Sequence, residues 1–363
     1  MPKLNLAVIA GDGTGPEVVA QAMRVLDAVA GRFDIRVTHD ALPYGGERYL
    51  DTGTVITEDE VAALRNYDAI LLGAVGHPDV PPGVLERGLL LRLRFDLDQY
   101  VNLRPVKLYD GVSTPLAGVG PDDIDLVVVR ENTEDLYCGS GGLVRKGTPH
   151  ELATQEMIAT RFGVERCVRY AFELAASRPR QKLTLVHKTN VLTYAGDLWM
   201  RCFTEVGEQD FPDVEREYHH VDACCMYLAT SPERYDTIVT ANMFGDIVTD
   251  LGAAIAGGMG IAASGNLNPD PNSDAPSMFE PVHGSSPDIA GQNKANPLAC
   301  IDSLALLLTE TGRVTGEQAM QDAGDAVNAA VRAVTPQFAG RRLDRSGYAC
   351  DEIGDRVLAA LPG

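Results

Sequence analysis

Residues 4–16 read Leu-Asn-Leu-Ala-Val-Ile-Ala-Gly-Asp-Gly-Thr-Gly-Pro, an apolar run followed by three closely spaced glycines. The run 4–10 has the length and composition of a buried β-strand, and Pro16 suits the first turn of a helix. A dinucleotide-binding turn would need the spacing G-x-G-x-x-G, but here the third glycine, Gly15, comes one residue early. The stretch therefore favours a tight strand-to-helix turn over a nucleotide site, and it begins an α/β fold.

Short apolar runs alternate with longer amphipathic stretches along the rest of the chain, which is typical of an α/β protein. We predict strands at 4–10, 69–73, 125–130, 182–187 and 237–240. We predict helices at 17–29, 58–66, 84–97, 161–175, 197–206, 246–256, 297–308 and 317–331. Because no linker interrupts this alternation, a second domain would be inserted into the first.

The composition excludes several classes of partner. The chain of 363 residues can bury one large core or two. Its 51 acidic and 31 basic side chains give a net charge of −20, which argues against binding to nucleic acid or to an anionic membrane surface. If the substrate is an anion, its site must gather the few positive charges in one place.

Two further features indicate a cytoplasmic protein. No apolar stretch approaches the roughly 20 residues of a membrane-spanning helix, and the N-terminal run is too short for a secretion signal. The seven cysteines form no C-x-x-C pair, so we expect reduced thiols.

The strongest local motif is Asn242-Met-Phe-Gly-Asp246-Ile-Val-Thr-Asp250. On a helix, Asp246 and Asp250 lie on one face, about one turn apart, and the glycine before Asp246 would let a ligand approach the backbone. Two like charges so placed repel each other unless a divalent cation such as Mg²⁺ or Mn²⁺ binds them both. Taken alone, the pair also fits a helix that Asp246 caps, with Asp250 solvated.

Arginines gather in two places despite the acidic average. Arg92, Arg94 and Arg104 lie close together in sequence, and Arg130 ends a predicted strand. A charge that ends a buried strand usually faces a cleft, and guanidinium groups bind carboxylates in bidentate fashion. A substrate with two carboxylates would explain the collection, although Arg92 also fits a surface helix.

Two residues could move protons near these charges. Lys188 follows a predicted strand and, beside a metal cation, could accept a proton. Tyr137 follows Arg130 closely and could supply a proton from the other side.

Six motifs occur in one order along the chain. They are Gly11-Asp-Gly-Thr-Gly-Pro-Glu17, Asn102-Leu-Arg-Pro105, Arg130-Glu-Asn-Thr-Glu134 with Tyr137, Lys188-Thr-Asn190, Phe244-Gly-Asp-Ile247 with Asp250, and Glu280-Pro-Val-His-Gly-Ser-Ser-Pro-Asp-Ile-Ala-Gly291. In this order they closely resemble the β-decarboxylating dehydrogenases, which act on 3-isopropylmalate, isocitrate, homoisocitrate, tartrate or D-malate. The resemblance runs from residue 4 to about residue 308.

This resemblance implies an isopropylmalate/isocitrate dehydrogenase-like α/β fold that is not a Rossmann fold. It implies a large, discontinuous cofactor-binding domain at 1–100 and 253–363. An inserted small domain at 101–252 would bind substrate and form a homodimer in which each active site uses both chains.

The resemblance also implies roles for individual residues. Arg94, Arg104, Arg130 and Tyr137 would act in one site with the metal ligands Asp246 and Asp250. Lys188, Asn190 and the third metal ligand Asp222 would come from the other chain. A Mg²⁺ or Mn²⁺ ion would polarise the hydroxy acid. Lys188 would accept the hydroxyl proton as hydride leaves for the nicotinamide, and Tyr137 would help to reprotonate the product after CO₂ is lost.

The segment 283–291 resembles the family's adenosine-binding loop. It implies cofactor contacts from His283, Gly284, Asp288, Ile289 and Asn296. At its position Asp288 could accept both ribose hydroxyls and would repel a 2′-phosphate, which favours NAD over NADP. Lys294 could partly offset that repulsion.

The stretch 86–90, Glu-Arg-Gly-Leu-Leu, resembles the specificity segment of the isopropylmalate enzymes. By that resemblance Glu86, Leu89, Leu90 and Val191 of the other chain surround the side group of the substrate. Burying an isopropyl group there is worth a few kcal/mol, whereas a third carboxylate would be desolvated and repelled by Glu86. The expected reaction converts 3-isopropylmalate into 4-methyl-2-oxopentanoate in leucine biosynthesis.

Other malate-type acids stay open as substrates. Arg87 could bind a third carboxylate if it turned inward. The stretch 130–137 is more similar to the isocitrate and homoisocitrate branch, and 98–104 is more similar to the tartrate/D-malate branch. A related alkylmalate of a secondary pathway is a further alternative.

Two hypotheses of another class are weaker. A catalytically silent, metabolite-sensing relative should lack a metal aspartate, the lysine or the tyrosine, and all of these are present here. A pure metal-binding protein could use His219-His220 with Asp222, but those histidines fit a strand at the edge of a sheet better.

Overall fold

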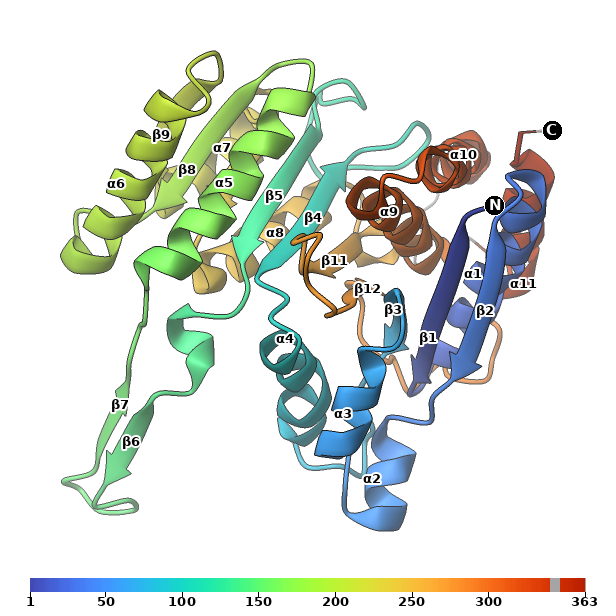
Figure 1. Ribbon diagram of the computed structural model, residues 1–363, viewed down its shortest axis with the longest axis horizontal. Coiled ribbons are helices and arrows are strands. Elements are labelled where there is room, and N and C mark those ends of the chain that lie inside the picture. The colour runs from blue at the N-terminus through green and yellow to red at the C-terminus, as the bar shows by residue number, and fades with distance from the viewer. Residues whose placement is uncertain (340–346, 363) are drawn as a thin grey trace. The chain divides into compact units, whose positions relative to one another are not determined.

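The computed structural model describes residues 1–339 and 347–362, and the chain divides into two compact units (Figure 1). Unit 1 consists of Met1–Gln99, Arg104–Ile124 and Ala253–Gly363, and unit 2 consists of Tyr100–Leu103 and Asp125–Gly252. Strand β4 (Val101–Lys107) is therefore divided between them. Residues 104–124 lie in unit 1, whereas the boundary drawn from the sequence assigned them to the small domain.

Unit 1 contains a mixed sheet with the strand order β2-β1-β3-β12-β11. These strands are β1 (Lys3–Gly11), β2 (Arg36–Ala41), β3 (Ala69–Ala74), β11 (Ala263–Leu267) and β12 (Ser277–Pro281). All neighbouring pairs are parallel except β11 and β12. β3 is buried along its whole length, which agrees with its continuous apolar sequence.

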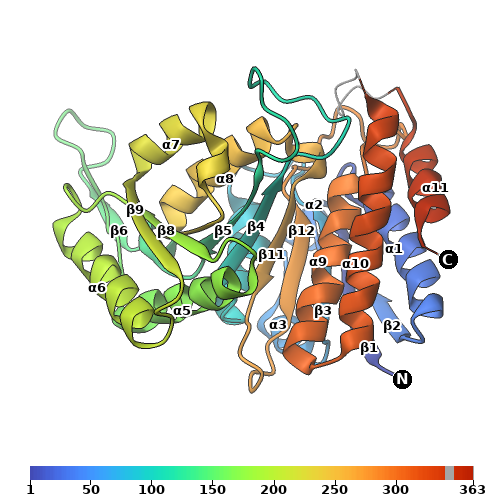
Figure 2. The ribbon, with the colours of Figure 1, turned by 90° about the horizontal axis from the view of Figure 1, so that it is seen from above.

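Helices pack on both faces of this sheet. The first group is α1 (Gly15–Arg32), α9 (Leu298–Thr315), α10 (Gln318–Val334) and α11 (Cys350–Ala360), which contact one another (Figure 2). The other face carries α2 (Gly46–Thr52), α3 (Glu58–Leu64) and α4 (Arg92–Asp96). There Ile70 and Leu72 of β3 join one apolar cluster with Leu64 of α3 and Leu93 of α4.

The glycine-rich turn after β1 is a structural junction. Gly11 and Gly13 have φ of +73° and +58°, in the left-handed region, and a Cβ on Gly11 would lie 2.0 Å from the carbonyl oxygen of Ala74. Asp12 accepts hydrogen bonds from the amides of Gly46 and Gly76 at 2.7 and 2.9 Å. The predicted strand-to-helix turn is therefore confirmed, and Asp12 ties it to two neighbouring loops.

Unit 2 contains a parallel sheet with the strand order β5-β10-β8-β9. Its strands are β5 (Asp125–Glu131), β8 (Lys182–His187), β9 (Glu215–His220) and β10 (Thr237–Thr240), and its helices are α5 (Arg161–Ser177), α6 (Thr193–Gln209), α7 (Val221–Thr230) and α8 (Asn242–Ile255). Because parallel strands end at the same edge, the residues that follow β5, β8 and β10 gather there.

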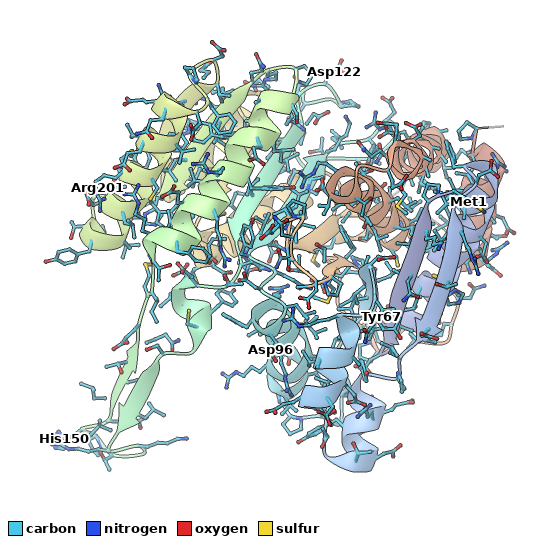
Figure 3. The ribbon with its side chains drawn as sticks, in the orientation of Figure 1. Met1, Tyr67, Asp96, Asp122, His150 and Arg201 are labelled. Atoms are coloured by element: carbon cyan, nitrogen blue, oxygen red, sulfur yellow. The ribbon has the colours of Figure 1, made fainter. Side chains whose placement is uncertain are left out.

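A two-stranded hairpin of β6 (Gly141–Val144) and β7 (Leu152–Gln155) extends from unit 2, with His150 at its tip (Figure 3). The side chains of Leu143, Val144 and Leu152 are all more than half exposed. An isolated two-stranded ribbon is marginally stable, so these apolar side chains suit a surface that another molecule covers.

Two predicted helices differ from the structure. The segment predicted as one α-helix at 84–97 contains a π-helix, Glu86–Leu91, followed by the short α4. The helix predicted from residue 246 begins at Asn242, so the alternative that Asp246 caps it is wrong. The polar strand β2 escaped prediction because it lies at a sheet edge and is largely exposed. His219 and His220 lie in β9 at the other edge of the sheet, as the sequence indicated.

The seven cysteines are all free thiols. Within the described residues, no helix combines the length and the apolar character that a membrane span requires.

A buried carboxylate lies between two helices of unit 1. Asp302 on α9 accepts hydrogen bonds from the hydroxyl of Tyr109 at 2.9 Å and from the side-chain amide of Asn328 at 3.2 Å. Burial raises the pKa of Asp302 from 3.8 to about 7. Because the folded chain then binds a proton that the unfolded chain has lost, stability falls as the pH rises from 3.8 towards about 7.

Replacing this carboxylate with an amide should therefore stabilise the protein most at high pH. We expect Asp302→Asn to gain stability over the unmodified protein, and the gain should grow by about 2–3 kcal/mol between pH 5 and pH 8. Chemical denaturation of both proteins at the two pH values measures this gain. A gain that is equal at pH 5 and pH 8 would contradict the assignment of the raised pKa.

Candidate active site

Arg130, at the end of β5, is the centre of a polar cluster in unit 2. Its side chain is 1 % exposed, its guanidinium forms an ion pair with Asp246, and its Nε donates to Oδ1 of Asn242 at 2.9 Å. The hydroxyl of Tyr137 donates to Oδ2 of Asp246 at 2.6 Å. Burial, together with this hydrogen bond, raises the pKa of Tyr137. The phenol is therefore protonated at neutral pH and able to donate.

Gly245 explains how the arginine reaches this position. A Cβ on Gly245 would lie 2.4 Å from Cγ of Arg130, so any larger residue would displace the arginine side chain. The sequence-based expectation that this glycine leaves room for a ligand was wrong, because Arg130 itself fills the space.

Asp246 and Asp250 both lie on α8, one turn apart, as predicted. The side chain of Asp246 is 45 % exposed, and Asp250 is exposed. Their carboxylate oxygens are of the kind that Mg²⁺ and Mn²⁺ prefer. In the described part of this single chain, however, no three His, Cys, Asp or Glu side chains converge in a way that could hold a metal ion.

Lys188 and Asp222 form a second pair in unit 2. Lys188 follows β8, and its Nζ donates to Oδ1 of Asp222 at 2.5 Å. This hydrogen bond lowers the pKa of Asp222. Asn190 is exposed and Val191 is 65 % exposed. Asn190, Val191 and Asp222, all assigned to the other chain, are thus accessible to a second molecule.

In unit 1 the structure distinguishes between two neighbouring arginines. Arg94 is buried on α4, and its Nη2 donates to Oε1 of Glu280 at 3.1 Å. Arg92 instead pairs with Asp96 and donates to the carbonyl of Ile56. Arg104 is also buried, in β4. Arg94 therefore fits the role of a substrate-binding arginine better than Arg92, whose guanidinium is bound locally.

The specificity segment divides into an inner and an outer face. Leu89 is fully buried in the apolar cluster of unit 1, Leu90 is half-buried against that cluster, and Glu86 is exposed. They lie on the π-helix Glu86–Leu91, a type of turn that is frequent at functional sites. Leu90 and Glu86 are therefore placed to meet a ligand, and Leu89 supports the segment from the core.

The loop predicted to bind the cofactor carries several accessible groups. Asp288 is exposed, and Oδ1 of Asn296 accepts the amide of Leu298 at the start of α9. Nδ1 of His283 lies 3.0 Å from the carbonyl of Gly284, and burial lowers the pKa of His283. Its Nε2 is buried with no hydrogen-bond partner among the described residues, which suits an acceptor for a bound ligand.

The same loop contacts the glycine-rich turn of the N-terminus. The amide of Thr14 donates to the carbonyl of Ser285 at 2.8 Å, and a Cβ on Gly13 would lie 2.1 Å from that carbonyl oxygen. Ile289 is half-buried and Gly284 is exposed. The glycine turn thus supports the cofactor loop, although its own spacing does not match a dinucleotide fingerprint.

The sequence reasoning missed two residues that contact the site arginines. Asn242 lies two residues after β10 and accepts a hydrogen bond from Arg130, so it carried a signal similar to that of Arg130, a polar residue at the end of a buried strand. Glu280 lies within β12, where it binds both Arg94 and Asn266. Glu280 begins the last of the six motifs, but no strand was predicted around it, so the sequence did not indicate its contact with Arg94.

Comparison with known proteins identifies relatives along nearly the whole chain. A family model described as isocitrate/isopropylmalate dehydrogenase matches residues 5–357. A protein of Thermobifida fusca named 3-isopropylmalate dehydrogenase is 62% identical over 309 residues, which cover 85% of this chain and 86% of the relative. A protein of the same name from Streptomyces coelicolor is 53% identical over 360 residues, which cover 99% of each chain.

Solved structures agree with these sequence relatives. A crystal structure named isocitrate dehydrogenase, from Methylococcus capsulatus, superposes with a TM-score of 0.83 at 31% sequence identity and covers 99% of both chains. The predicted fold, an isopropylmalate/isocitrate dehydrogenase-like α/β fold, is therefore confirmed. The chain belongs to the isocitrate/isopropylmalate dehydrogenase family.

Proposed function

We propose that this chain catalyses the NAD- and divalent-metal-dependent oxidative decarboxylation of 3-isopropylmalate to 4-methyl-2-oxopentanoate in leucine biosynthesis. The observation that carries the proposal is the cluster of Arg130, Tyr137 and Asp246, which combines an anion-binding group, a proton donor and a metal ligand. Relatives at 53–62% identity named 3-isopropylmalate dehydrogenase support the choice of substrate.

Each of three arginines can bind a carboxylate of the kind that 3-isopropylmalate shares with other malates. Arg94, Arg104 and Arg130 are all nine-tenths or more buried, so their charges are only weakly screened by solvent. Their guanidinium groups can each make bidentate contacts. The side group of the substrate then meets Leu90 and Glu86, where an isopropyl group loses water more cheaply than a third carboxylate.

Asp246 and Asp250 would hold a divalent cation together with Asp222 of a second chain. Such a cation would supply polarisation of the substrate hydroxyl group and stabilisation of the charge that develops on it. Tyr137, with its raised pKa, holds a proton beside Asp246 and donates it to the carbon that loses CO₂. Lys188 accepts the hydroxyl proton from the other side.

NAD binds at the loop of His283, Gly284, Asp288, Ile289 and Asn296. His283 would help to hold the adenosine part of the cofactor, since its Nε2 has no hydrogen-bond partner among the described residues and can accept one. The exposed carboxylate of Asp288 accepts from the ribose hydroxyls and repels a 2′-phosphate. Lys294 donates to Oε1 of Gln292 at 2.7 Å. Its ammonium group is therefore bound to a side chain of the protein and is not needed to bind the 2′-phosphate of NADP.

The active protein is a homodimer with shared sites. Lys188 and Asp222 are bound to each other within one chain, and the metal ligands do not converge there. Apolar side chains are exposed on the helices of unit 2, with Met226 on α7 and Ile247 on α8 both at least half exposed. A second chain would cover these side chains and bring its own Lys188 and Asp222 to the site.

Assays with a panel of substrates test the choice of 3-isopropylmalate. With NAD and Mn²⁺, we expect kcat/KM for isopropylmalate to exceed that for isocitrate, homoisocitrate, D-malate and tartrate by about tenfold or more. The reason is that Leu90 and Glu86 favour an apolar side group. A higher kcat/KM for isocitrate would overturn the substrate assignment, and replacing NAD by NADP should lower kcat/KM through Asp288.

Mixed dimers test the shared site. We expect Lys188→Ala and Asp246→Asn homodimers each to lose nearly all activity. Co-expression of the two variants should restore about a quarter of the wild-type activity, because half of the dimers then contain one intact site. The matched control is co-expression of two copies of Lys188→Ala, because no dimer then contains an intact Lys188. If the mixed dimers are as inactive as that control, each site belongs to a single chain.

A further inference from the structure

A buried carboxylate outside the assigned site joins the two elements that carry Tyr137 and Asp246. Asp135 is 3 % exposed and begins the short 3-10 turn Asp135–Cys138, which contains Tyr137. Its Oδ2 accepts a hydrogen bond from the backbone amide of Met243 at 2.7 Å. Met243 lies in the first turn of α8, the helix of Asp246.

This contact supplies the N-terminal cap of α8 from a distant part of the chain. A helix leaves its first amides without partners within the helix, and a side chain just before it usually accepts one of them. Ala241 precedes α8 and has no side-chain acceptor. Asp135 makes the missing bond, and its negative charge also suits the positive end of the helix dipole.

A second bond fastens the same two elements. The side-chain amide of Asn242 donates to the carbonyl of Glu134 at 3.3 Å, while the amide of Asp135 donates to the carbonyl of Ile158 at 2.8 Å. Asp135 also has φ of +68°, a left-handed conformation that non-glycine residues seldom adopt. The left-handed conformation costs an aspartate some conformational energy, which indicates that the hydrogen bond of its carboxylate offsets this cost.

We propose that Asp135 is a positioning residue for catalysis, because its bond to the α8 amide fixes Tyr137 at its 2.6 Å contact with Asp246. The inference rests on the proposed function only where turnover is measured. Without the bond, the turn and the helix keep only the longer contact from Asn242 to the carbonyl of Glu134, so the phenol of Tyr137 is held less firmly in line with the carbon it protonates. Such a loss lowers kcat and leaves substrate binding by Arg94 and Arg104 intact.

Two substitutions separate the carboxylate from the backbone conformation. Asp135→Gly keeps the left-handed φ without strain and removes the acceptor. Asp135→Asn also tolerates that φ and keeps an oxygen that can accept from Met243. We expect Asp135→Gly to lower kcat about tenfold with KM within about twofold, and Asp135→Asn to retain most of kcat.

The effect of Asp135→Gly on kcat should depend on the hydroxyl group of Tyr137. In a Tyr137→Phe background, which lacks the hydroxyl, we expect Asp135→Gly to change kcat by less than about twofold. Thr57→Ala is the control for a lost helix cap, because Thr57 caps α3 in unit 1 by accepting the amide of Glu60. It should leave kcat unchanged.

Hydrogen exchange measured by mass spectrometry tests the positioning without any substrate. In Asp135→Gly, the amides of the first turn of α8 should exchange about tenfold faster, and in Asp135→Asn at close to the wild-type rate. Unchanged exchange in Asp135→Gly would overturn the inference. Faster exchange together with a wild-type kcat would also overturn it. So would a loss of kcat that is equal in the wild-type and the Tyr137→Phe backgrounds. If the wild-type protein turns over none of the panel, the proposed function fails, and the exchange result alone decides the role of Asp135.

Discussion

The ion pair between Arg130 and Asp246 is the interaction on which the candidate site depends. Each group pairs with the other in the free chain and would bind a ligand in the proposed reaction. The arginine would bind a substrate carboxylate, and the aspartate would bind a metal ion. In the free chain they neutralise each other, which makes a nearly fully buried guanidinium tolerable. Gly245 gives the arginine room, Asn242 orients its Nε, and Tyr137 shares the aspartate. The site is therefore preorganised by its own charges before any ligand arrives.

Unit 1 also contains an arginine that is paired with a carboxylate of the chain and would have to change partner when a substrate binds. Arg94 donates to Glu280 and Arg130 pairs with Asp246, so two of the arginines proposed to bind the substrate are neutralised by carboxylates of the chain itself. Lys188 is likewise bound to Asp222. A dicarboxylate that enters together with a divalent cation brings charges of both signs, so in unit 2 it would offer new partners to Arg130 and to Asp246 together.

Much of the fold could be predicted because buried parallel strands have continuous apolar sequences. A polar residue at or just after the end of such a strand indicates the edge of the sheet where the candidate site lies. Arg130 and Lys188 were found in this way, and Asn242 carried the same signal. The start of α8 could not be predicted, because its cap comes from Asp135, which lies far away in sequence. The π-helix at Glu86–Leu91 was also missed, since the spacing of its apolar residues fits an α-helix almost as well. Local patterns thus identified the elements, whereas contacts between distant segments set their ends.

The coupling between metal and substrate tests this account most directly. If Arg130 neutralises Asp246 until a substrate carboxylate replaces that aspartate as its partner, Mn²⁺ should bind weakly to the free protein and more tightly in the presence of isopropylmalate. Calorimetric titration of Mn²⁺ with and without the substrate measures the difference. We predict an affinity about tenfold higher with substrate present. Equal affinities in both titrations would show that the Arg130–Asp246 pair does not oppose metal binding, which would contradict the account.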